Sequence, residues 1–405
     1  MGTEHKQKSG NFMRKIWIMA GEASGDIYGA ALAEDLRKCG KASGVEVEIG
    51  GMGGPAMAKA NVKRTVDSTE LGVVGFVEIL KHIFTFIGIF RKLVRTVKAE
   101  RPDAVILIDY PTFNMLFGNI VKKLGIPVIW YVSPHVWVWG KRRIPKLARL
   151  CRKMLVIFPF EPEVYASSGL DTEFVGHPLL DMVDARKDTG IVRDDKLVAL
   201  LPGSRAMEID RLLEPMLATT LELYKKHPEL RFVITTPREK VALRCQAIVE
   251  KFRSKNPNLP EIPVEIGKTA YYQQAAGTGL AASGTVTVES AIAGLPLVVT
   301  YKVSWISILI AALVVKLYRN SFVMPNIIAN KKVYAEFLQH QVKPANLVPA
   351  MEAILPGGDD RRRVIEGMQE VRTLLGDDGN ARRKASERAA EAVWKTLPPA
   401  IETDK

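Results

Sequence analysis

Short apolar or alternating runs are separated by amphipathic stretches of helical length along most of this chain. Strands are predicted at Ile16–Ala20, Val45–Ile49, Ala104–Ile108 and Val128–Val132, and a helix is predicted at Tyr28–Cys39. This alternation is typical of βαβ units on a parallel sheet. The N-terminal part of the chain is therefore predicted to be an α/β domain.

A second series of the same kind follows a polar, charged segment. Its strands are predicted at Val198–Leu201, Arg231–Thr235, Val264–Ile266, Gly279–Ala282 and Pro296–Thr300. The predicted organisation is a flexible tail at 1–14, an N-terminal domain at 15–180, a linker at 181–196, a C-terminal domain at 197–378, and a helix and tail at 379–405. We expect two doubly wound, Rossmann-like α/β domains facing a cleft, with ligands at the carboxyl ends of the strands.

The charge balance narrows the class of partner. The 405 residues include 57 Lys and Arg against 44 Asp and Glu, a net charge of +13 that favours nucleic acid, phospholipid headgroups or phosphorylated substrates. A nucleic-acid-binding module would need basic residues interleaved with stacking aromatics, or a groove-reading helix. Neither arrangement is clear in the sequence, so no nucleic-acid partner is expected.

The cysteines and the N-terminus indicate the compartment. Cys39, Cys151 and Cys245 are scattered, without CxxC spacing or a His-rich neighbourhood, so neither a disulfide framework nor a zinc site is predicted. The apolar stretch Ile16–Ala20 behind the basic N-terminus is too short for a signal-peptide core. A cytoplasmic protein is expected.

Two segments are candidates for contact with a membrane surface. From Ile83 to Lys98, apolar residues recur at helical spacing beside basic ones, as in a helix lying at an anionic interface. A buried helix with a solvated basic edge would give a similar pattern. The second segment, Trp305–Val315, has about half of the roughly 20 residues needed to cross a bilayer. Any membrane association is therefore expected to be peripheral.

Two predicted strand ends in the N-terminal domain carry acidic side chains. In the loop after Ile16–Ala20, small residues let a ligand approach the backbone, and a tight turn alone does not explain Glu22, Ser24 and Asp26. Asp109 ends an apolar strand, where a carboxylate is held firmly enough to take the proton from an attacking hydroxyl. A helix cap is the structural alternative for Asp109.

A third strand end runs into aromatic and basic residues. Ser133, His135 and Trp137 precede the cluster Lys141–Arg143. His135 alone would more often be a hydrogen-bonded structural residue than a base. In this company, the loop is interpreted as part of an acceptor or phosphate site.

The strongest signals for a nucleotide lie in the C-terminal domain. After one strand, Gly203 and Ser204 offer hydrogen-bond donors, and Arg205 can hold phosphate oxygens of a departing diphosphate. After another strand, a helix begins at Ser283-Gly284-Thr285, and a helix N-terminus favours a diphosphate. One turn later, Glu289 can accept hydrogen bonds from ribose hydroxyls.

Two further amides and the question of a metal complete the predicted site. Asn326 and Gln339 lie where a nucleotide-sugar pocket could continue, although polar loop residues would look the same. No DxD motif or His/carboxylate cluster lies at a strand end near the predicted diphosphate site. No metal and no other cofactor is expected.

Taken together, these motifs resemble those of the lipid A disaccharide synthase family. The resemblance spans Ile16 to Ala345 in the right order. It rests on GEASGD at 21–26, IDYP at 108–111 with FN at 113–114, YVSP at 131–134 with VW at 136–137, LPGSR at 201–205, SGT at 283–285 with Glu289, and PN at 325–326. No single widespread motif carries it.

The resemblance implies a GT-B fold and an inverting, metal-independent glycosyltransferase. The implied donor is UDP-2,3-diacylglucosamine and the implied acceptor is 2,3-diacylglucosamine 1-phosphate. Association with the inner membrane surface and, in some members, a homodimer are implied as well. The matching functional residues are Asp109 as the base, Arg205 and Glu289 as ligands of UDP, and Glu22, Asn326 and Gln339 as residues tied to activity.

Two positions depart from the family pattern, and related enzymes stay as alternatives. Thr112 stands where many members carry a second acidic residue, and His135 stands where many carry a serine. The alternatives are other UDP-N-acetylglucosamine-dependent enzymes on the same two-domain plan, namely a peptidoglycan lipid glycosyltransferase or a 2-epimerase. An epimerase would need acid and base groups around the donor sugar and no surface for acyl chains.

Overall fold

The computed structural model of the chain describes residues 12–68, 83–302, 321–379, 382–399 and 401–402. The chain divides into two compact units. One contains the chain up to Pro178 together with the segment after Asn380, and the other begins at Leu179. Each unit is an α/β domain, as predicted. The run Trp305–Val315, predicted as a membrane surface, lies outside the described residues.

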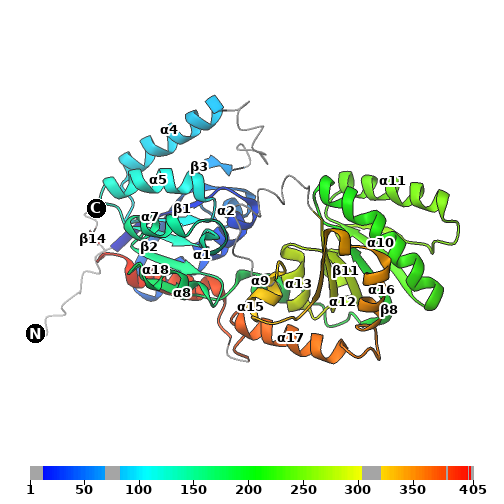
Figure 1. Cartoon of the computed structure of the whole chain (residues 1–405). Coiled ribbons are helices and arrows are strands. Elements are labelled where there is room, and N and C mark those ends of the chain that lie inside the picture. Colours follow the sequence, from blue (N-terminus) through cyan, green and yellow to red (C-terminus); the bar gives the residue numbers. More distant parts are fainter. Residues whose placement is uncertain (1–11, 69–82, 303–320, 380–381, 400, 403–405) are drawn as a thin grey trace, which may run out of the picture. The chain divides into compact units, whose positions relative to one another are not determined.

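The N-terminal unit is built on one sheet of mainly parallel strands (Figure 1). These are β1 (Phe12–Ala20), β2 (Val45–Gly53), β3 (Lys63–Asp67), β4 (Ala104–Ile108), β5 (Val128–Tyr131), β6 (Lys153–Val156), β7 (Thr172–Phe174) and β14 (Ile401–Glu402). Their order is β3-β2-β1-β4-β5-β6-β7, and β14 pairs antiparallel with the start of β1. In this doubly wound order, ligands bind at the carboxyl ends of the strands where the order reverses, between β1 and β4.

Helices cover both faces of this sheet. On one side lie α4 (Ile83–Glu100), α5 (Pro111–Lys123) and α7 (Ile144–Leu150), and on the other lie α1 (Ala23–Ala42), α2 (Pro55–Lys59) and α18 (Ala385–Thr396). The short helices α6 (Val136–Trp139), with a 3-10 turn at Lys141–Arg143, and α8 (Glu161–Ala166) follow β5 and β6. Because helices cover both faces, all five residues of β4 are buried, which explains its uninterrupted apolar run.

The C-terminal unit repeats the same plan. Its strands are β8 (Asp194–Leu201), β9 (Arg231–Thr236), β10 (Val264–Ile266), β11 (Ala276–Ala282), β12 (Leu297–Tyr301) and β13 (Ala335–Leu338), in the order β10-β9-β8-β11-β12-β13. Every pairing is parallel. The order reverses between β8 and β11, so the ligand site of a fold of this type is expected there.

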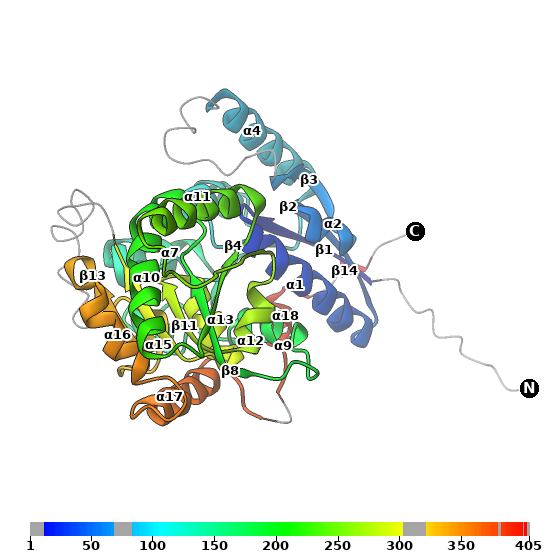
Figure 2. The same ribbon diagram turned by 90° about the vertical axis from the view of Figure 1, so that its right-hand side faces the viewer.

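Its helices also form two layers (Figure 2). The first layer contains α10 (Ala206–Lys226), α11 (Glu239–Lys255) and α16 (Pro344–Glu352). The second contains α12 (Thr269–Ala275), α13 (Thr285–Ala293), α15 (Met324–Ile328) and α17 (Arg361–Leu374). A 3-10 turn at Gln339–Gln341 follows β13, and α9 (Pro178–Ala185) begins at the boundary between the units.

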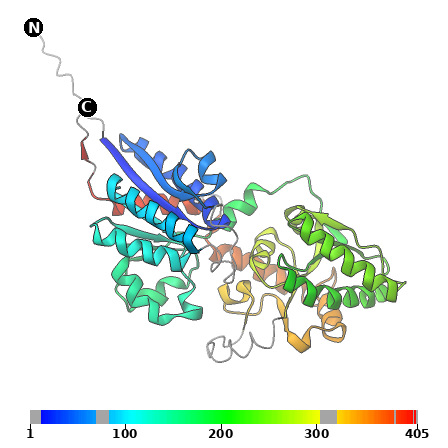
Figure 3. The same ribbon diagram turned by 90° about the horizontal axis from the view of Figure 1, so that it is seen from above.

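The last helix belongs to the first unit. Figure 3 shows α18 in red among the blue elements of the N-terminal sheet, and it packs on α1. The guanidinium carbon of Arg14 lies 4.8 Å from the centre of the Trp394 ring, and Arg14 Nη2 donates to the carbonyl of Pro398 at 2.6 Å. The C-terminal segment therefore completes a domain that begins almost 400 residues earlier in the chain.

All the predicted strands are present, and several short ones were not predicted. The unpredicted strands have two to five residues each: β3, β6, β7, β13 and β14. Residues 12–14, expected in a tail, begin β1, and the segment 181–196, expected as a linker, contains most of α9 and the start of β8. Strands this short leave little periodicity to detect.

Candidate active site

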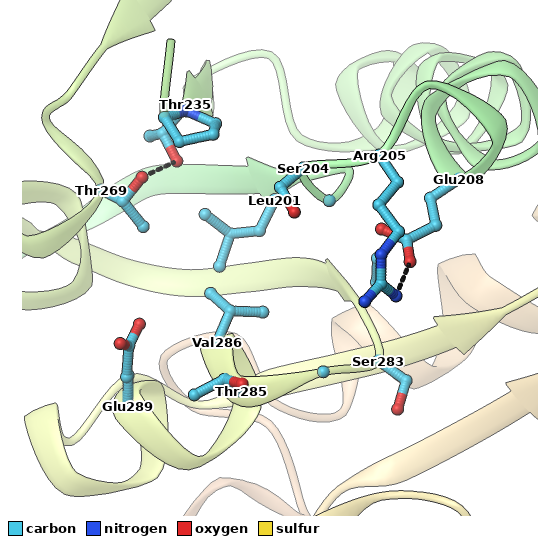
Figure 4. Close-up of a pocket in the computed structure, with 14 residues that line it drawn as sticks. Leu201, Ser204, Arg205, Glu208, Thr235, Thr269, Ser283, Thr285, Val286 and Glu289 are labelled. Carbon is cyan, nitrogen blue, oxygen red and sulfur yellow. Dashed lines mark hydrogen bonds and ion pairs between the residues drawn. The ribbon is translucent and has the colours of Figure 1, made fainter. Parts of the chain in front are cut away.

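A pocket opens at the carboxyl ends of β8 and β11, where the strand order of the C-terminal unit reverses (Figure 4). Its volume is about 360 Å³. All seven residues predicted to bind UDP line it: Gly203, Ser204, Arg205, Ser283, Gly284, Thr285 and Glu289. Two loops that lie about 80 residues apart in sequence are thus brought to one site by the parallel pairing of β8 and β11.

The first loop has a backbone that favours glycine. Gly203 has φ +104°, and a Cβ atom there would lie 2.6 Å from Oε2 of Glu208. A side chain at position 203 would therefore strain the backbone and displace Glu208. The absence of a side chain also lets a ligand approach the chain closely at this point.

Arg205 supplies the positive charge of the pocket. Its side chain is 80% exposed, and its Nη1 lies 3.0 Å from Oε1 of Glu208. In Figure 4 the two side chains lie together at one side of the pocket, above Ser283. Because a guanidinium has five N–H donors, the contact with Glu208 leaves others for phosphate oxygens.

Glu289 lies on the second turn of α13. Burial raises its pKa, while the charge of Arg186 and a hydrogen bond from Gln273 act in the opposite direction. A half-buried carboxylate that faces a pocket is suited to accept hydrogen bonds from a pair of hydroxyls. Glu289 and Arg205 line the same pocket, and Figure 4 shows them on opposite sides of it.

The pocket also contains residues that were not predicted. Thr235 lies near the end of β9, Pro237 follows that strand, and Thr269 begins α12. The hydroxyls of Thr235 and Thr269 are 3.1 Å apart. Figure 4 shows this pair on the side of the pocket away from Arg205. The sequence does contain a feature that indicates this wall of the pocket, namely Thr235-Thr-Pro237 at the end of β9. Because β9 pairs in parallel with β8, the two strands end at the same edge of the sheet.

The N-terminal unit places Asp109 at the corresponding position of its own sheet. Asp109 follows β4, and its N–H donates to the carbonyl of Tyr131 at 3.2 Å. Asp109 and Tyr110 have φ values of +45° and +46°, so two consecutive residues other than glycine are left-handed. Such backbone strain is concentrated at functional sites because the surrounding structure must hold it.

Two carboxylates and a phenol share this position. Burial raises the pKa of Asp109, opposed by a hydrogen bond from the Tyr110 backbone. The pKa of Glu22 is raised by partial loss of solvent and by the negative charge of Asp109. Burial, followed by the charge of Glu22, raises the pKa of Tyr110. Glu22 and Asp109, both predicted to be catalytic, therefore lie close enough for their charges to interact.

The other residues of the first loop have different surroundings. Asp26 is buried, and its carboxylate accepts hydrogen bonds from the backbone N–H groups of Gly54, Ala56 and Met57 at 2.7, 2.8 and 3.0 Å. This holds the start of α2, a structural role that the position of Asp26 in the loop did not predict. Ser24 is exposed in the first turn of α1.

The loop after β5 has an exposed outer side and rests on buried polar side chains. His135 is exposed, and its ring meets Trp137 edge-on with 5.6 Å between ring centres. Ser133 is buried, with its hydroxyl 2.7 Å from that of Tyr165. Beneath them, Glu161 is fully buried and accepts the backbone N–H of Phe158 at 3.0 Å.

Asn326 and Gln339 lie apart from the pocket. The Asn326 amide is buried, donates to the carbonyl of Tyr334 at 3.0 Å and accepts from the N–H groups of Val333 and Tyr334 at 2.9 and 2.8 Å. Gln339 lines a different cavity of the C-terminal unit, with Asp210 and Lys302 among its walls. Neither of these two predicted residues lines the pocket at the carboxyl ends of β8 and β11.

Helix α4 has one buried face and one exposed face. Leu93 and Val97 are fully buried, and Phe90 packs edge-on against Phe113 with 5.5 Å between ring centres. Phe84 is 86% exposed and Ile87 is 38% exposed. The exposed face also carries Arg91, Lys92, Arg95 and Lys98. The helix therefore contributes to the core and still presents apolar and basic side chains to solvent.

Metal-ligand clusters and membrane-spanning helices are both absent from the described residues. No group of three or more His, Cys, Asp or Glu side chains in that part of the chain is arranged to hold a metal ion. Nor is any helix among the described segments long and apolar enough to span a bilayer.

The chain matches the family model described as lipid-A-disaccharide synthetase over residues 16–393. It is 33% identical over 395 residues to the lipid-A-disaccharide synthase of Syntrophotalea carbinolica, covering 95% of this chain and 97% of that one. The corresponding protein of Syntrophus aciditrophicus is 36% identical over 377 residues, with 91% and 96% covered. A solved UDP-GlcNAc 2-epimerase from Neisseria meningitidis, bound to UDP-GlcNAc, has a TM-score of 0.58 at 14% identity and covers 94% of this chain and 99% of that one. This last similarity shows the fold alone.

Proposed function

The chain belongs to the lipid-A-disaccharide synthase family, and from this we propose that it joins UDP-2,3-diacylglucosamine to 2,3-diacylglucosamine 1-phosphate. It is a glycosyltransferase of lipid A synthesis with a GT-B fold. The proposed products are a tetraacyl disaccharide 1-phosphate and UDP. The observation that carries the proposal is the pocket of the C-terminal unit, which gathers all seven residues expected to bind UDP.

The pocket supports a proposal for the donor. Arg205 and the hydroxyl of Ser204 bind the diphosphate from one loop, and Ser283 and Thr285 bind it from the other. Glu289 accepts hydrogen bonds from the ribose. As the bond between the anomeric carbon of the donor and the diphosphate oxygen breaks, UDP leaves with the bonding electrons, and its diphosphate gains negative charge. A fixed cation such as Arg205 stabilises that charge more in the transition state than in the bound substrate.

The N-terminal unit supports a proposal for the acceptor side. The acceptor hydroxyl attacks the anomeric carbon, the new C–O bond forms as the bond to UDP breaks, and the hydroxyl proton passes to the carboxylate of Asp109. One displacement inverts the configuration at that carbon. Burial raises the pKa of Asp109 towards the operating pH, which makes it a more effective general base. The negative charge of Asp109 contributes to raising the pKa of Glu22, after burial, so the two carboxyl groups titrate as a coupled pair.

The loop after β5 and the cofactor requirement complete the proposed mechanism. His135 and Trp137, exposed or half-buried at the end of β5, contact the acceptor, while Ser133 supports the loop from within. The reaction is proposed to need no metal, because arginine, hydroxyls and helix termini provide the charge stabilisation.

We place the reaction at a membrane surface through the exposed face of α4. Phe84 and Ile87 are the apolar side chains that enter the interface, and Arg91, Arg95 and Lys98 contact anionic headgroups. Both proposed substrates carry acyl chains, so an enzyme held at the bilayer meets them where they partition. A homodimer stays a prediction that sedimentation would check.

The test is a direct assay with a base variant. Purified protein is incubated with both acylated substrates in detergent with EDTA, and disaccharide and UDP are followed by mass spectrometry. Asp109→Ala is run in parallel with Glu34→Ala, an exposed carboxylate of α1 in the same unit. We expect product from wild type and Glu34→Ala and almost none from Asp109→Ala.

Each other outcome has a definite meaning. If wild type gives no product although the lipids are shown to be dispersed, the proposed reaction is wrong. Conversion of UDP-N-acetylglucosamine to its 2-epimer without an acceptor would point to the epimerase alternative. Equal product from wild type and Asp109→Ala would keep the enzyme and discard Asp109 as its base.

A further inference from the structure

We propose that Asn114 is a positioning residue that holds the backbone of Asp109 in its left-handed conformation. This inference rests on the proposed role of Asp109 as the base. Asn114 lies in the second turn of α5 and is fully buried. It was part of a sequence motif but was assigned no function.

Asn114 binds three consecutive carbonyl groups. Its side-chain Nδ2 donates to the carbonyl of Ile108 at 3.1 Å and to that of Asp109 at 2.8 Å. Its backbone N–H donates to the carbonyl of Tyr110 at 3.1 Å. A single residue therefore fixes the whole connection between β4 and α5.

That connection needs to be held. Asp109 and Tyr110 both have positive φ, which side chains other than glycine rarely adopt, and two such residues in succession are less common still. Tyr110 is the N-cap of α5, and no side chain caps the helix there. The amide of Asn114 provides a restraint from inside the domain instead, because it binds the carbonyls of Ile108 and Asp109, one before and one within the turn.

The unused part of the same amide favours a positioning role. Oδ1 of Asn114 is buried and accepts no hydrogen bond from any described residue. A buried acceptor without a partner reduces stability. The reverse orientation of the amide would place Oδ1 against two carbonyl oxygens, so the two donated bonds fix the orientation. The side chain therefore donates two hydrogen bonds to the turn through Nδ2, while its own acceptor, Oδ1, has no hydrogen bond from any described residue.

Asn114 acts through Asp109 and does not face the ligand. The turn directs the Asp109 carboxylate and also the Tyr110 N–H, which hydrogen-bonds that carboxylate and lowers its pKa. If the turn relaxes, the base moves and this hydrogen bond changes. Turnover and its dependence on pH should therefore change, while the nucleotide pocket in the other unit is untouched.

The experiment compares Asn114→Ala and the isosteric Asn114→Asp with Asn119→Ala. Asn119 lies on the same helix and also donates to a helix carbonyl, that of Met115 at 2.6 Å, but it is exposed. The measurements are kcat, KM for the acylated acceptor, UDP affinity and the pH profile of kcat. Tryptophan fluorescence follows folding of the N-terminal unit, which contains five of the six tryptophans.

We expect both Asn114 variants to lose on the order of 10²-fold in kcat, since misplacing a catalytic group by about 1 Å has that effect. Acceptor KM and UDP affinity should stay within about twofold of wild type, because a residue that only positions the base affects turnover and not substrate binding. The acidic limb of the pH profile should move, because the Tyr110 N–H no longer holds the same contact with Asp109. Asn119→Ala should match wild type.

Two results would overturn the proposal. One is a wild-type kcat and pH profile in either folded Asn114 variant. The other is a loss of activity in both variants that only follows the loss of folded protein, with kcat per folded molecule and the pH profile unchanged, which would make Asn114 purely structural. Asp109→Ala is assayed alongside. If it retains wild-type activity, the proposed base fails, whereas an inactive Asp109→Ala with active Asn114 variants refutes only the positioning role.

Discussion

A Cβ atom on Gly21 would lie 2.4 Å from Cδ1 of the Tyr110 ring. The loop after β1 and the turn after β4 are therefore in direct contact, and position 21 has no room for a side chain beside that ring. Glu22 follows Gly21 and Asp109 precedes Tyr110, so this contact sets the spacing of the two carboxylates proposed to act in catalysis.

Gly21→Ala should accordingly impair activity through Tyr110. The added methyl group meets the inner atoms of the ring, which cannot move without the backbone of the turn. We expect a fall in kcat on the order of 10-fold to 10²-fold, measured in the disaccharide assay. Gly88→Ala is the matched control, because nothing lies within 4 Å of its Cβ position and it lies within helix α4. It should leave kcat unchanged and stabilise the fold by about 0.5–1 kcal/mol.

Arg205→Ala should weaken the binding of UDP. A hydrogen bond to a charged group contributes about 1.5–3 kcal/mol. Titration calorimetry should therefore show an affinity for UDP that is about 10-fold to 10²-fold weaker than that of wild type. Arg205→Lys should recover part of this loss, since a lysine keeps the charge but not the planar pair of donors. Arg211→Ala is the control, because Arg211 lies on α10, the helix that Arg205 precedes, but in the wall of another cavity. An unchanged Kd for Arg205→Ala would remove Arg205 from the proposed site.

The rate should rise with pH along an acidic limb that depends on Glu22. Burial raises the pKa of Asp109, so the carboxylate is protonated up to a higher pH than an ordinary Asp and acts as a base only above it. The interaction between two charges is reciprocal, and Glu22→Gln removes a negative neighbour of Asp109. The limb of the kcat profile should then shift to lower pH. A shift to higher pH would contradict the proposed coupling.

Glu161→Gln should stabilise the N-terminal unit at neutral and higher pH. Burial raises the pKa of Glu161 from 4.5 to about 7, so the folded state holds its proton more tightly than the unfolded state. Stability is therefore greatest below the unfolded pKa and is lost as pH rises from 4.5 to about 7. The full difference corresponds to about 3 kcal/mol.

Urea unfolding at several pH values, followed by tryptophan fluorescence, would measure this effect. The gain of Glu161→Gln over wild type should be near zero at the acidic end and should grow towards pH 8. Glu163→Gln is the control, since Glu163 lies on the same helix but is exposed. A gain that does not depend on pH would contradict the assigned cause.

Replacing the exposed apolar side chains of α4 should reduce binding to anionic membranes. Phe84→Ser with Ile87→Ser removes the two apolar groups of the exposed face and keeps its charges. We expect about tenfold weaker co-sedimentation with vesicles of phosphatidylethanolamine and phosphatidylglycerol, and weak binding of wild type to pure phosphatidylcholine. Leu243→Ser, an exposed leucine on α11 of the other unit, is the control. Equal binding by the double variant would place the contact elsewhere.

The sequence predicted those parts of the site that depend on one strand and the turn after it. β4 could be recognised because both of its faces are buried, and Asp109 at its end was therefore noticed. The nucleotide loops were recognised for the same reason, since each follows a buried strand directly. Parallel pairing then brings such turns together without any further information from the sequence.

The remaining features depend on contacts between distant segments. Asp26 was expected to face substrate, but its partners lie 28 to 31 residues further along the chain, at α2. Thr269 joins the pocket only because its hydroxyl meets that of Thr235, 34 residues away. Asn326 has a local role, yet its residue type alone does not distinguish a backbone clamp from a ligand.

The packing of α18 on α1 has a consequence for biosynthesis. The N-terminal sheet is translated early, but its final helix is made only after roughly 200 further residues, which at about 5–20 residues per second takes about 10–40 s. Throughout that interval α18 does not yet cover the surface of α1 around Gly40, where an added Cβ atom would lie 3.6 Å from the Trp394 ring of the finished protein. A nascent or truncated chain that ends before Trp394 therefore exposes the face of α1 on which α18 packs, and that face is available to chaperones, to proteases or to the last helix of another copy.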